Sequence, residues 1–262
     1  MPYCAVNGIR IHYEVSGEGF PMVFVHANPF DHRLWMYQAA HFSTFFKVIA
    51  VDIRGYGRSD KPVSETSVVE MAEDIVGVCR QERVSEAIFC GISVGGNLVL
   101  QLALNHPDLC RALIVVGCSS GPSPHQARTD GYMNQGVAKY HIQHLRNLVS
   151  EEFTATKVGS YLLGLFTDTD DWLKPEALRA IFNALERKNL TDRLGELQMP
   201  VLVINGEFDP AKPRSIETSR RIKGAEHRTI PGSGHACCLE QPAVFDETLC
   251  EFLKKNGLMT PG

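Results

Sequence analysis

Short apolar runs alternate with helical patterns along most of this 262-residue chain, and this alternation restricts the fold more than any other feature. We predict strands at 22–26, 46–52, 87–90, 111–117, 201–205 and 226–230. We predict helices at 31–41, 67–83, 94–106, 215–223 and 242–254, with a capping-box pair, Ser67 and Glu70, at the start of the second. Because parallel strands need crossover connections, the alternation predicts an α/β fold with a mostly parallel central sheet and helices on both faces. Ligands bind such sheets at the carboxyl ends of the strands.

Two segments depart from the alternation. The first ten residues read as a β-hairpin that turns at Asn7-Gly8, a favoured two-residue turn. From 121 to 197, helical patterns follow one another without a clear strand. This segment comes after the strand 111–117, which is the sixth strand of the chain when the two strands of the hairpin are counted. We therefore expect a core formed by 1–120 and 198–262, with 121–197 inserted as a helical cap.

Ser93 lies in a Gly-x-Ser-x-Gly pentapeptide, 91–95, between a predicted strand and a predicted helix. A serine at such a sharp turn projects its hydroxyl from the edge of the sheet. Glycines on both sides let the backbone pack closely where a Cβ would clash. An ordinary helix N-cap is the alternative, but a cap needs no flanking glycines. We predict that Ser93 is a nucleophile.

A serine nucleophile needs a base, and the base needs a group that orients it. Asp209 comes just after the predicted strand 201–205, and His235 lies in a glycine-rich loop after the predicted strand 226–230. Both side chains are therefore expected at the same sheet edge as Ser93. Asp209 could instead be a turn former before Pro210. Asp52 is the competing carboxylate, but we expect it to brace the loop 54–58.

The remaining requirement is an oxyanion hole, meaning donors aimed at the oxygen that gains negative charge. The predicted strand 22–26 runs into Ala27-Asn28-Pro29. We assign the donors to the backbone N–H groups of Asn28 and Val94, with Ala27 as the alternative to Asn28. His26 is expected to support this loop. Cys237 and Cys238 lie near His235, but we interpret them as packing residues.

Five segments of the chain, 26–29, 52–60, 91–95, 206–209 and 234–235, resemble those of α/β-hydrolases of the single-domain, lid-bearing type. The resemblance covers essentially the whole chain, and the order serine, aspartate, histidine is that of this family. Ala27 stands where the family usually has glycine. The Asn28-Pro29 pair is similar to haloalkane dehalogenases, but those enzymes use an aspartate nucleophile where this chain has Ser93.

The resemblance implies a serine hydrolase that cleaves a small carboxylic ester through an acyl-enzyme, without a cofactor or a metal. Lactones, thioesters and perhydrolysis use the same residues and stay open as alternatives. A carbon–carbon hydrolase of the meta-cleavage type shares the triad, but it carries tryptophan where this chain has Ala236. A cofactor-free haloperoxidase activity and a ligand receptor without turnover are further alternatives.

The cap is expected to supply the substrate pocket. Most of its apolar side chains must form its own core, but a few should face the site and bind an apolar acyl or aromatic group. The candidates are Tyr140, Tyr161, Leu165, Phe166 and Trp172. His125, His141 and His144 are too scattered in the sequence to be assigned as metal ligands.

Composition limits the partners. The formal net charge is −4 with no basic block, which gives no support for a nucleic acid or an acidic membrane. No apolar run approaches the ~20 residues needed to cross a bilayer. The first ten residues lack the pattern of a secretion signal, and the 8 cysteines include no Cys-x-x-Cys pair. We therefore expect a cytoplasmic protein with reduced thiols, whose oligomeric state the sequence does not indicate. The last four residues, 259–262, are expected to be a loose tail.

Overall fold

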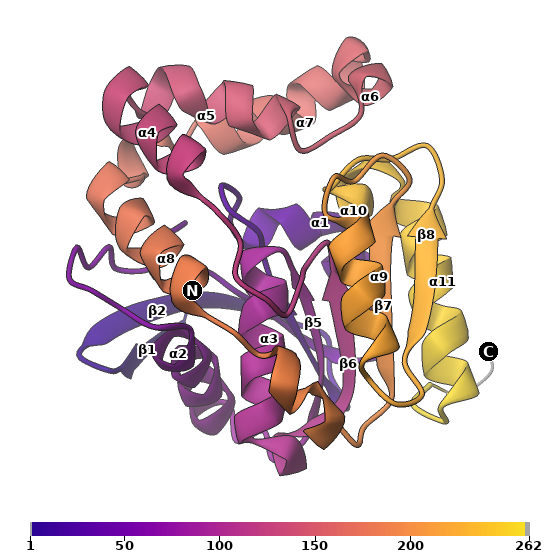
Figure 1. The fold of residues 1–262 in the computed structure, drawn as a ribbon. Coiled ribbons are helices and arrows are strands. Elements are labelled where there is room, and N and C mark those ends of the chain that lie inside the picture. Colours follow the sequence, from indigo (N-terminus) through magenta and orange to yellow (C-terminus); the bar gives the residue numbers. More distant parts are fainter. Residues whose placement is uncertain (1, 260–262) are drawn as a thin grey trace.

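The computed structural model describes residues 2–259 and contains one eight-stranded sheet (Figure 1). The order of its strands across the sheet is β1-β2-β4-β3-β5-β6-β7-β8. The strands are β1 (Tyr3–Val6), β2 (Ile9–Ser16), β3 (Pro21–Val25), β4 (Lys47–Val51), β5 (Ala87–Ile92), β6 (Cys110–Val116), β7 (Val201–Gly206) and β8 (Glu226–Ile230). Strands β3 to β8 are parallel to one another, and the antiparallel pairs are β1 with β2 and β2 with β4. The predicted fold class is confirmed.

The N-terminal hairpin turns where the sequence predicts. Val6 pairs with Ile9, so Asn7 and Gly8 form the two-residue turn between β1 and β2. Their φ angles of 51° and 74° are both positive, as a type I′ turn requires. The right-handed twist of such a turn matches that of the strands that it joins.

Helices cover both faces of the sheet, and a separate hydrophobic core lies on each face. Along β3, Val23 and Val25 point into one core, and Met22 and Phe24 point into the other. This alternation is the two-residue period of a strand that is buried on both sides. The helices outside 121–197 are η1 (His32–Trp35), α1 (Met36–Phe42), α2 (Val68–Gln81), α3 (Val94–Asn105), η2 (Pro107–Leu109), α9 (Lys212–Arg220), α10 (Cys237–Glu240) and α11 (Pro242–Lys255).

Residues 121–197, all of which the structure describes, contain helices and no strand. These helices are α4 (Gln126–Gln135), α5 (Val137–Arg146), α6 (Glu151–Ala155), α7 (Lys157–Thr167), η3 (Asp170–Trp172), α8 (Pro175–Arg187) and η4 (Thr191–Glu196). Helices α4 to α7 lie together at one end of the molecule, and α8 runs back towards α2 (Figure 1). The helices are inserted after the sixth strand, as predicted. The division into a core and a cap that act separately stays a prediction.

Most predicted elements differ from the observed ones by one to three residues at their ends. The segment 31–41 is a larger difference, because a turn of 3-10 helix, η1, precedes α1 there. Asp31 causes this start: its carboxylate accepts a hydrogen bond from the backbone N–H of Arg33. Helix α9 begins at Lys212, three residues before the prediction, with Pro213 in its first turn. Of the predicted loose tail, residues 260–262 lie outside the described part of the chain.

Candidate active site

Ser93 stands at the junction of β5 and α3 in a backbone conformation that is rare for a residue with a side chain. Its φ and ψ are 54° and −111°, and its side chain makes no capping hydrogen bond to the helix. The N-cap alternative for Ser93 is therefore not supported by the geometry. Rare backbone conformations of this kind cost roughly 1–3 kcal/mol and are concentrated at functional sites.

The two glycines of the pentapeptide are required by close packing. A Cβ at Gly95 would clash with the carbonyl oxygens of Val25 and His26, at the end of β3. A Cβ at Gly91 would clash with the carbonyl of Gly95 in the first turn of α3. The turn that carries Ser93 is thus pressed against the strand that leads to Asn28.

Asp209 and His235 meet although they follow different strands. The Nδ1 of His235 lies 2.9 Å from the Oδ1 of Asp209, and both side chains are buried. The carboxylate also accepts hydrogen bonds from the backbone N–H of Ala211 at 2.8 Å and from the Nδ2 of Asn205 at 2.7 Å. Burial opposes ionisation of Asp209, but the charge and hydrogen bond of His235 outweigh it, so the pKa of Asp209 lies below its ordinary value.

Gly117, just after β6, connects this pair to Ser93. The carbonyl of Val116, its neighbour, accepts a 2.8 Å hydrogen bond from the backbone N–H of Ser93. A Cβ at Gly117 would lie 2.7 Å from the Cε1 of His235 and 3.1 Å from the Oδ2 of Asp209. The three predicted catalytic residues therefore gather around the carboxyl end of β6. Only glycine leaves room there for the imidazole.

The loop after β3 is held by its side chains. His26 is fully buried, with its Nδ1 2.9 Å from the carbonyl of Ala27 and its Nε2 accepting from the N–H of Ile53 at 3.0 Å. Burial lowers the pKa of His26, which is therefore neutral. The Oδ1 of Asn28 accepts from the Tyr56 hydroxyl at 2.9 Å. His26 therefore ties this loop to the end of β4, which is the supporting role predicted for it.

The predicted oxyanion donors are free of other backbone partners. Within residues 2–259, no backbone carbonyl accepts a hydrogen bond from the N–H of Asn28 or of Val94. The carbonyl of Ala27 accepts from the N–H of Phe30 at 2.9 Å, which closes a tight turn around Asn28. Both N–H groups belong to segments that Gly95 brings into contact. Their assignment as oxyanion donors stays a prediction.

A cavity of about 300 Å³ opens beside Asp209 and His235. Its other lining residues come from the cap and from the start of α9: Arg128, Tyr140, His144, Asn147, Leu148, Pro210, Ala211 and Arg214. Polar and charged side chains make up much of this lining. The sequence predicts a mainly hydrophobic pocket, so the observed cavity differs from that expectation.

The five predicted pocket residues lie in different places. Tyr140 lines the cavity. Phe166 is buried in a core, where its ring packs edge-on against Phe30 with 4.8 Å between centroids, and Leu165 packs against that core. Tyr161 is 68% exposed, and Trp172 is 41% exposed. Only Tyr140 of the five lines the observed cavity, because periodicity identifies apolar side chains but not the partner that each one covers.

Cys237 and Cys238 are buried in α10, and burial raises the pKa of both thiols well above its ordinary value. A thiol in this state supplies almost no thiolate, which is the reactive form. The interpretation of these cysteines as packing residues is confirmed by their burial in the core on that side of the sheet.

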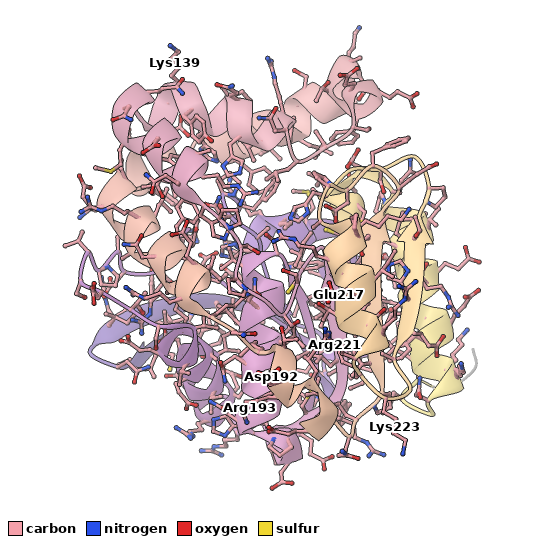
Figure 2. All side chains as sticks on the ribbon, viewed as in Figure 1. Lys139, Asp192, Arg193, Glu217, Arg221 and Lys223 are labelled. Carbon is pink, nitrogen blue, oxygen red and sulfur yellow. The ribbon has the colours of Figure 1, made fainter. Side chains whose placement is uncertain are left out.

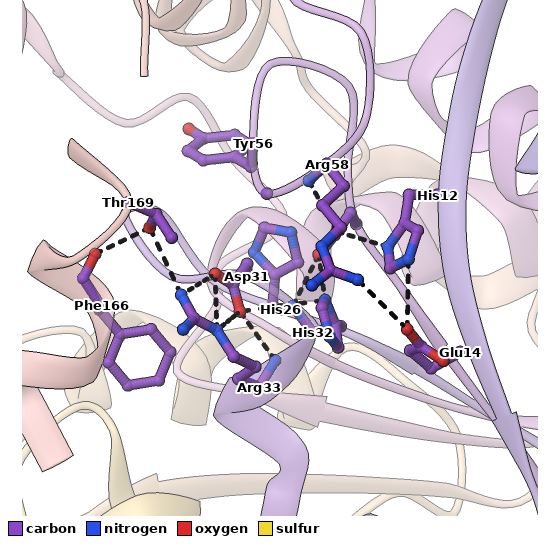
Figure 3. Close-up of polar contacts among 12 residues, drawn as sticks. His12, Glu14, His26, Asp31, His32, Arg33, Tyr56, Arg58, Phe166 and Thr169 are labelled. Atoms are coloured by element: carbon purple, nitrogen blue, oxygen red, sulfur yellow. Dashed lines mark hydrogen bonds and ion pairs between the residues drawn. The ribbon is translucent and has the colours of Figure 1, made fainter. Parts of the chain in front are cut away.

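Asp52 is the centre of a buried polar cluster that does not include His235. Its Oδ1 accepts a hydrogen bond from the backbone N–H of His32 at 2.8 Å. The same oxygen also lies 2.8 Å from the Nδ1 of His32. Its Oδ2 accepts from the N–H of Arg58 at 2.9 Å and faces the Nδ1 of His12 at 2.8 Å. Figure 3 shows His12, His32 and Arg58 gathered side by side. Asp52 therefore braces the loop 54–58, as predicted, but no pattern in the sequence indicated that two histidines would join it.

The same cluster has the residue types of a metal site but the spacing of hydrogen bonds. His12, His32 and Asp52 each offer one possible metal-ligand atom, and these three atoms lie within 4.8 Å of one another. A tetrahedral zinc about 2.0–2.1 Å from each ligand would hold the ligand atoms about 3.3 Å apart. The two 2.8 Å contacts to the carboxylate are shorter than that. The arrangement is that of a carboxylate stabilised by four donors.

Replacing Asp52 with asparagine is expected to lower the free energy of unfolding by about 3–5 kcal/mol, the usual effect of removing one partner from a buried charged pair. An asparagine would turn its NH₂ towards groups that themselves donate. Hydrogen bonds from the two histidines, together with the positive charge of His32, outweigh burial and lower the pKa of Asp52. Its contribution is thus present above the unfolded pKa of about 3.9 and is lost as the pH falls further.

His32 sets the upper limit of this pH window. Burial opposes the charged form of His32, but the hydrogen bond and charge of Asp52 outweigh burial and raise the pKa of His32. The contribution of His32 to the free energy of unfolding is therefore present below about pH 6.5 and is lost as the pH rises through its folded pKa. The difference between wild type and Asp52→Asn should therefore be largest at about pH 4–6.5, measured by urea unfolding. Asp60→Asn, which removes a partly exposed partner of Arg10, is the control and should cost less than about 1 kcal/mol. Equal effects of the two substitutions would contradict this account of Asp52.

Among the cavity residues that the sequence-based prediction missed, three carry a charged or titratable side chain: Arg128, His144 and Arg214. Arg128 and Arg214 resemble ordinary solvated charges in a helical pattern, and nothing in the sequence brings them together. His144 had a weak signal, since it is one of three histidines in the cap. In the structure its Nδ1 lies 3.1 Å from the Tyr132 hydroxyl, and burial lowers its pKa well below 6.5.

Comparisons with known proteins identify the family to which this fold belongs. The family model described as alpha/beta hydrolase fold matches residues 21–242, so the chain belongs to that family. It is similar to the pimeloyl-[acyl-carrier protein] methyl ester esterase of Yersinia enterocolitica, with 26% identity over 95% of this chain and 99% of the relative. It is also similar to the solved structure of Est816, an N-acyl homoserine lactone degrading enzyme, with 30% identity, a TM-score of 0.82, and 96% and 100% of the two chains covered.

The fold alone is supported by a third similarity, to the enol-lactonase of Burkholderia xenovorans LB400. That structure has a TM-score of 0.90 at 24% identity, with 97% of this chain and 100% of that chain covered. The relatives named here are hydrolases of esters and lactones, and this chain is an enzyme of the hydrolase class. Within the described residues, no helix is long and apolar enough to cross a membrane.

Proposed function

We propose that this protein is a serine hydrolase that cleaves a small carboxylic ester through an acyl-enzyme. The observation that carries the proposal is the 2.9 Å contact between the Nδ1 of His235 and the Oδ1 of Asp209, beside the turn that holds Ser93. Because Nδ1 is engaged with the carboxylate, Nε2 is the ring nitrogen left to accept a proton. An aspartate in this position fixes the imidazole tautomer that a base requires.

In the proposed reaction, Nε2 of His235 takes the Ser93 proton as Oγ forms a bond to the ester carbonyl carbon. The backbone N–H groups of Asn28 and Val94 donate to the resulting oxyanion. The imidazolium then protonates the leaving alkoxide, and the C–O bond breaks to give an alcohol and the acyl-enzyme. Water activated by His235 hydrolyses the acyl-enzyme to a carboxylic acid and restores the Ser93 hydroxyl. The steps balance without a redox partner.

Lactone hydrolysis is the second candidate function. A lactone is a cyclic ester, so the same attack opens its ring and leaves the alcohol tethered to the acyl group. The similarity to Est816, named as a lactone-degrading enzyme, favours this candidate. The apolar part of either substrate would lie against Leu148, Pro210 and the ring of Tyr140. A reducing compartment such as the cytoplasm suits the free cysteines.

The proposal is tested by measuring kcat/KM of the purified protein for esters of graded acyl length, several lactones and a ring-fission dienoate. We expect turnover of short esters or lactones at roughly 1–1000 s⁻¹. Preferential turnover of the dienoate would instead favour a carbon–carbon hydrolase. Specific binding of these compounds without turnover of any would favour a receptor.

The same ester series tests the proposal that residues 121–197 select the substrate without taking part in bond breaking. Tyr140 lines the cavity, whereas Tyr161 lies on the same cap and is 68% exposed. Tyr140→Ala should change the kcat/KM ratio between short and long acyl groups by about tenfold or more, and Tyr161→Ala should leave the ratio unchanged. Loss of all ester turnover in a folded Tyr140→Ala variant would contradict this division of roles.

A further inference from the structure

The cavity beside His235 contains two guanidinium groups and no free carboxylate. Arg128 and Arg214 both line it, one from α4 and the other from α9. Asp209 is the only acidic residue of the lining, and both of its oxygens are already engaged. The cavity is therefore a region of positive charge next to the candidate base, His235.

Arg128 is partly buried without an ion pair. Its Nη1 donates a 2.7 Å hydrogen bond to the Nδ1 of His125, and no carboxylate of residues 2–259 forms an ion pair with it. His125 is neutral, because burial and the charge of Arg128 lower its pKa to about 3. Burial also lowers the pKa of Arg128 itself. A cation in this state is costly unless another molecule supplies the negative charge.

Two other arginines of the chain show what is missing at Arg128. Arg54 is buried and pairs with Asp74 at 2.5 Å and with Glu70 at 2.7 Å. Arg33 is partly buried and pairs with Asp31 at 2.7 Å. Elsewhere in the described chain, an arginine withdrawn from solvent is thus matched by a carboxylate. Arg128 is the exception, and it lines the cavity that contains His235.

Arg214 adds a second positive charge at the mouth of the cavity. It is exposed, and its Nη1 lies 3.4 Å from the carbonyl of Pro122, with no carboxylate of the described residues paired to it. Its charge opposes ionisation of Arg128, so the two groups repel each other across the cavity. A bound carboxylate would relieve that repulsion, and guanidinium groups match carboxylates in geometry.

We propose that the substrate of this enzyme carries a carboxylate in addition to its scissile ester, and that Arg128, assisted by Arg214, binds that carboxylate. The substrate class is a small half-ester of a dicarboxylic acid, or a lactone with a carboxylate side chain. The inference rests on the proposed function for the scissile bond. The cavity of about 300 Å³ is at the lower end of ligand sites, which also favours a small substrate.

The test compares monomethyl glutarate with dimethyl glutarate, which differ in the free carboxylate. Wild-type enzyme should hydrolyse the monoester with a kcat/KM at least tenfold higher. Arg128→Gln should lower kcat/KM for the monoester by about 10- to 100-fold, the effect of losing a charge-assisted hydrogen bond, and change the diester by less than about threefold. Arg214→Gln should have a smaller effect, because its side chain is exposed.

Lys139→Gln is the matched control. Lys139 is an exposed cation on α5 that points away from the molecule at the outer surface of the cap (Figure 2). The Lys139→Gln variant should have the same preference for the monoester as the wild type. An equal loss of activity towards both esters in Arg128→Gln, or a wild-type preference for the diester, would overturn the proposal.

A binding measurement separates this inference from the proposed function. Glutarate should bind the Ser93→Ala variant in isothermal titration calorimetry and should bind at least tenfold more weakly when Arg128→Gln is added. No binding to Ser93→Ala would overturn the carboxylate proposal. Binding that depends on Arg128, together with the absence of hydrolysis of any ester, would support the carboxylate site and contradict only the serine hydrolase. A neutral fluorophosphonate should label the Arg128→Gln variant at the wild-type rate.

Discussion

Replacing Ser93 with alanine is expected to lower kcat for ester hydrolysis on the order of 10⁶-fold, the effect seen when a triad nucleophile is removed. No other hydroxyl or thiol is proposed to attack the carbonyl, so His235 would have no nucleophile to activate. Residual hydrolysis would come only from the oxyanion donors and from binding. The measurement is kcat for the best ester of the series, with wild type and variant prepared in parallel.

Ser93→Gly separates loss of function from loss of structure. The φ of 54° at this position disfavours any residue with a Cβ, and glycine adopts positive φ readily. The glycine variant should thus be as inactive as Ser93→Ala but at least as stable as wild type in thermal unfolding. Turnover of either variant within tenfold of wild type would contradict the assignment of Ser93.

Replacing Asp209 with asparagine is expected to lower kcat by about 10³–10⁴-fold, with little change of the fold. The contacts of the Asp209 carboxylate explain the size of this loss in kcat. If the asparagine amide keeps its oxygen towards His235, its NH₂ faces the donor Nδ2 of Asn205. If it turns round, its NH₂ faces Nδ1 of His235 and favours the tautomer whose Nε2 carries the proton. That tautomer does not accept the proton of Ser93.

The control for Asp209→Asn is Glu207→Gln. Glu207 lies two residues earlier, is exposed, and accepts a hydrogen bond from the backbone N–H of Gly232. The Glu207→Gln variant should keep nearly full activity. If Asp209→Asn kept nearly full activity while Asp52→Asn lost it without unfolding, the orienting carboxylate would be Asp52 and not Asp209.

The order of strands and helices and the positions of the candidate triad could be predicted because each depends on local signals. The Asn7-Gly8 pair specifies a two-residue turn, and Ser67 begins α2 by accepting from the N–H of Glu70 at 3.0 Å. The capping box is only half formed, because the Glu70 carboxylate pairs with Arg54. That pairing depends on tertiary structure, which the local pattern does not contain.

The charged lining of the cavity could not be predicted, for a physical reason. Arg128 and Arg214 belong to separate helices with polar faces, and each by itself is typical of a solvated surface. They become a pair only when α4 and α9 come together around the same cavity. Similarly, His12 and His32 meet Asp52 because β2 pairs with β4 and the η1 turn follows β3. Patterns in a single sequence describe faces of elements, whereas these sites lie between elements.

The nucleophile is the central claim, and covalent labelling tests it most directly. Purified protein treated with a fluorophosphonate should gain one label by intact mass, and peptide mapping should locate that label on Ser93. Ser93→Ala should gain none, and Asp209→Asn should be labelled far more slowly than wild type. A label on another serine or on a cysteine, or undiminished labelling of Ser93→Ala, would contradict the account.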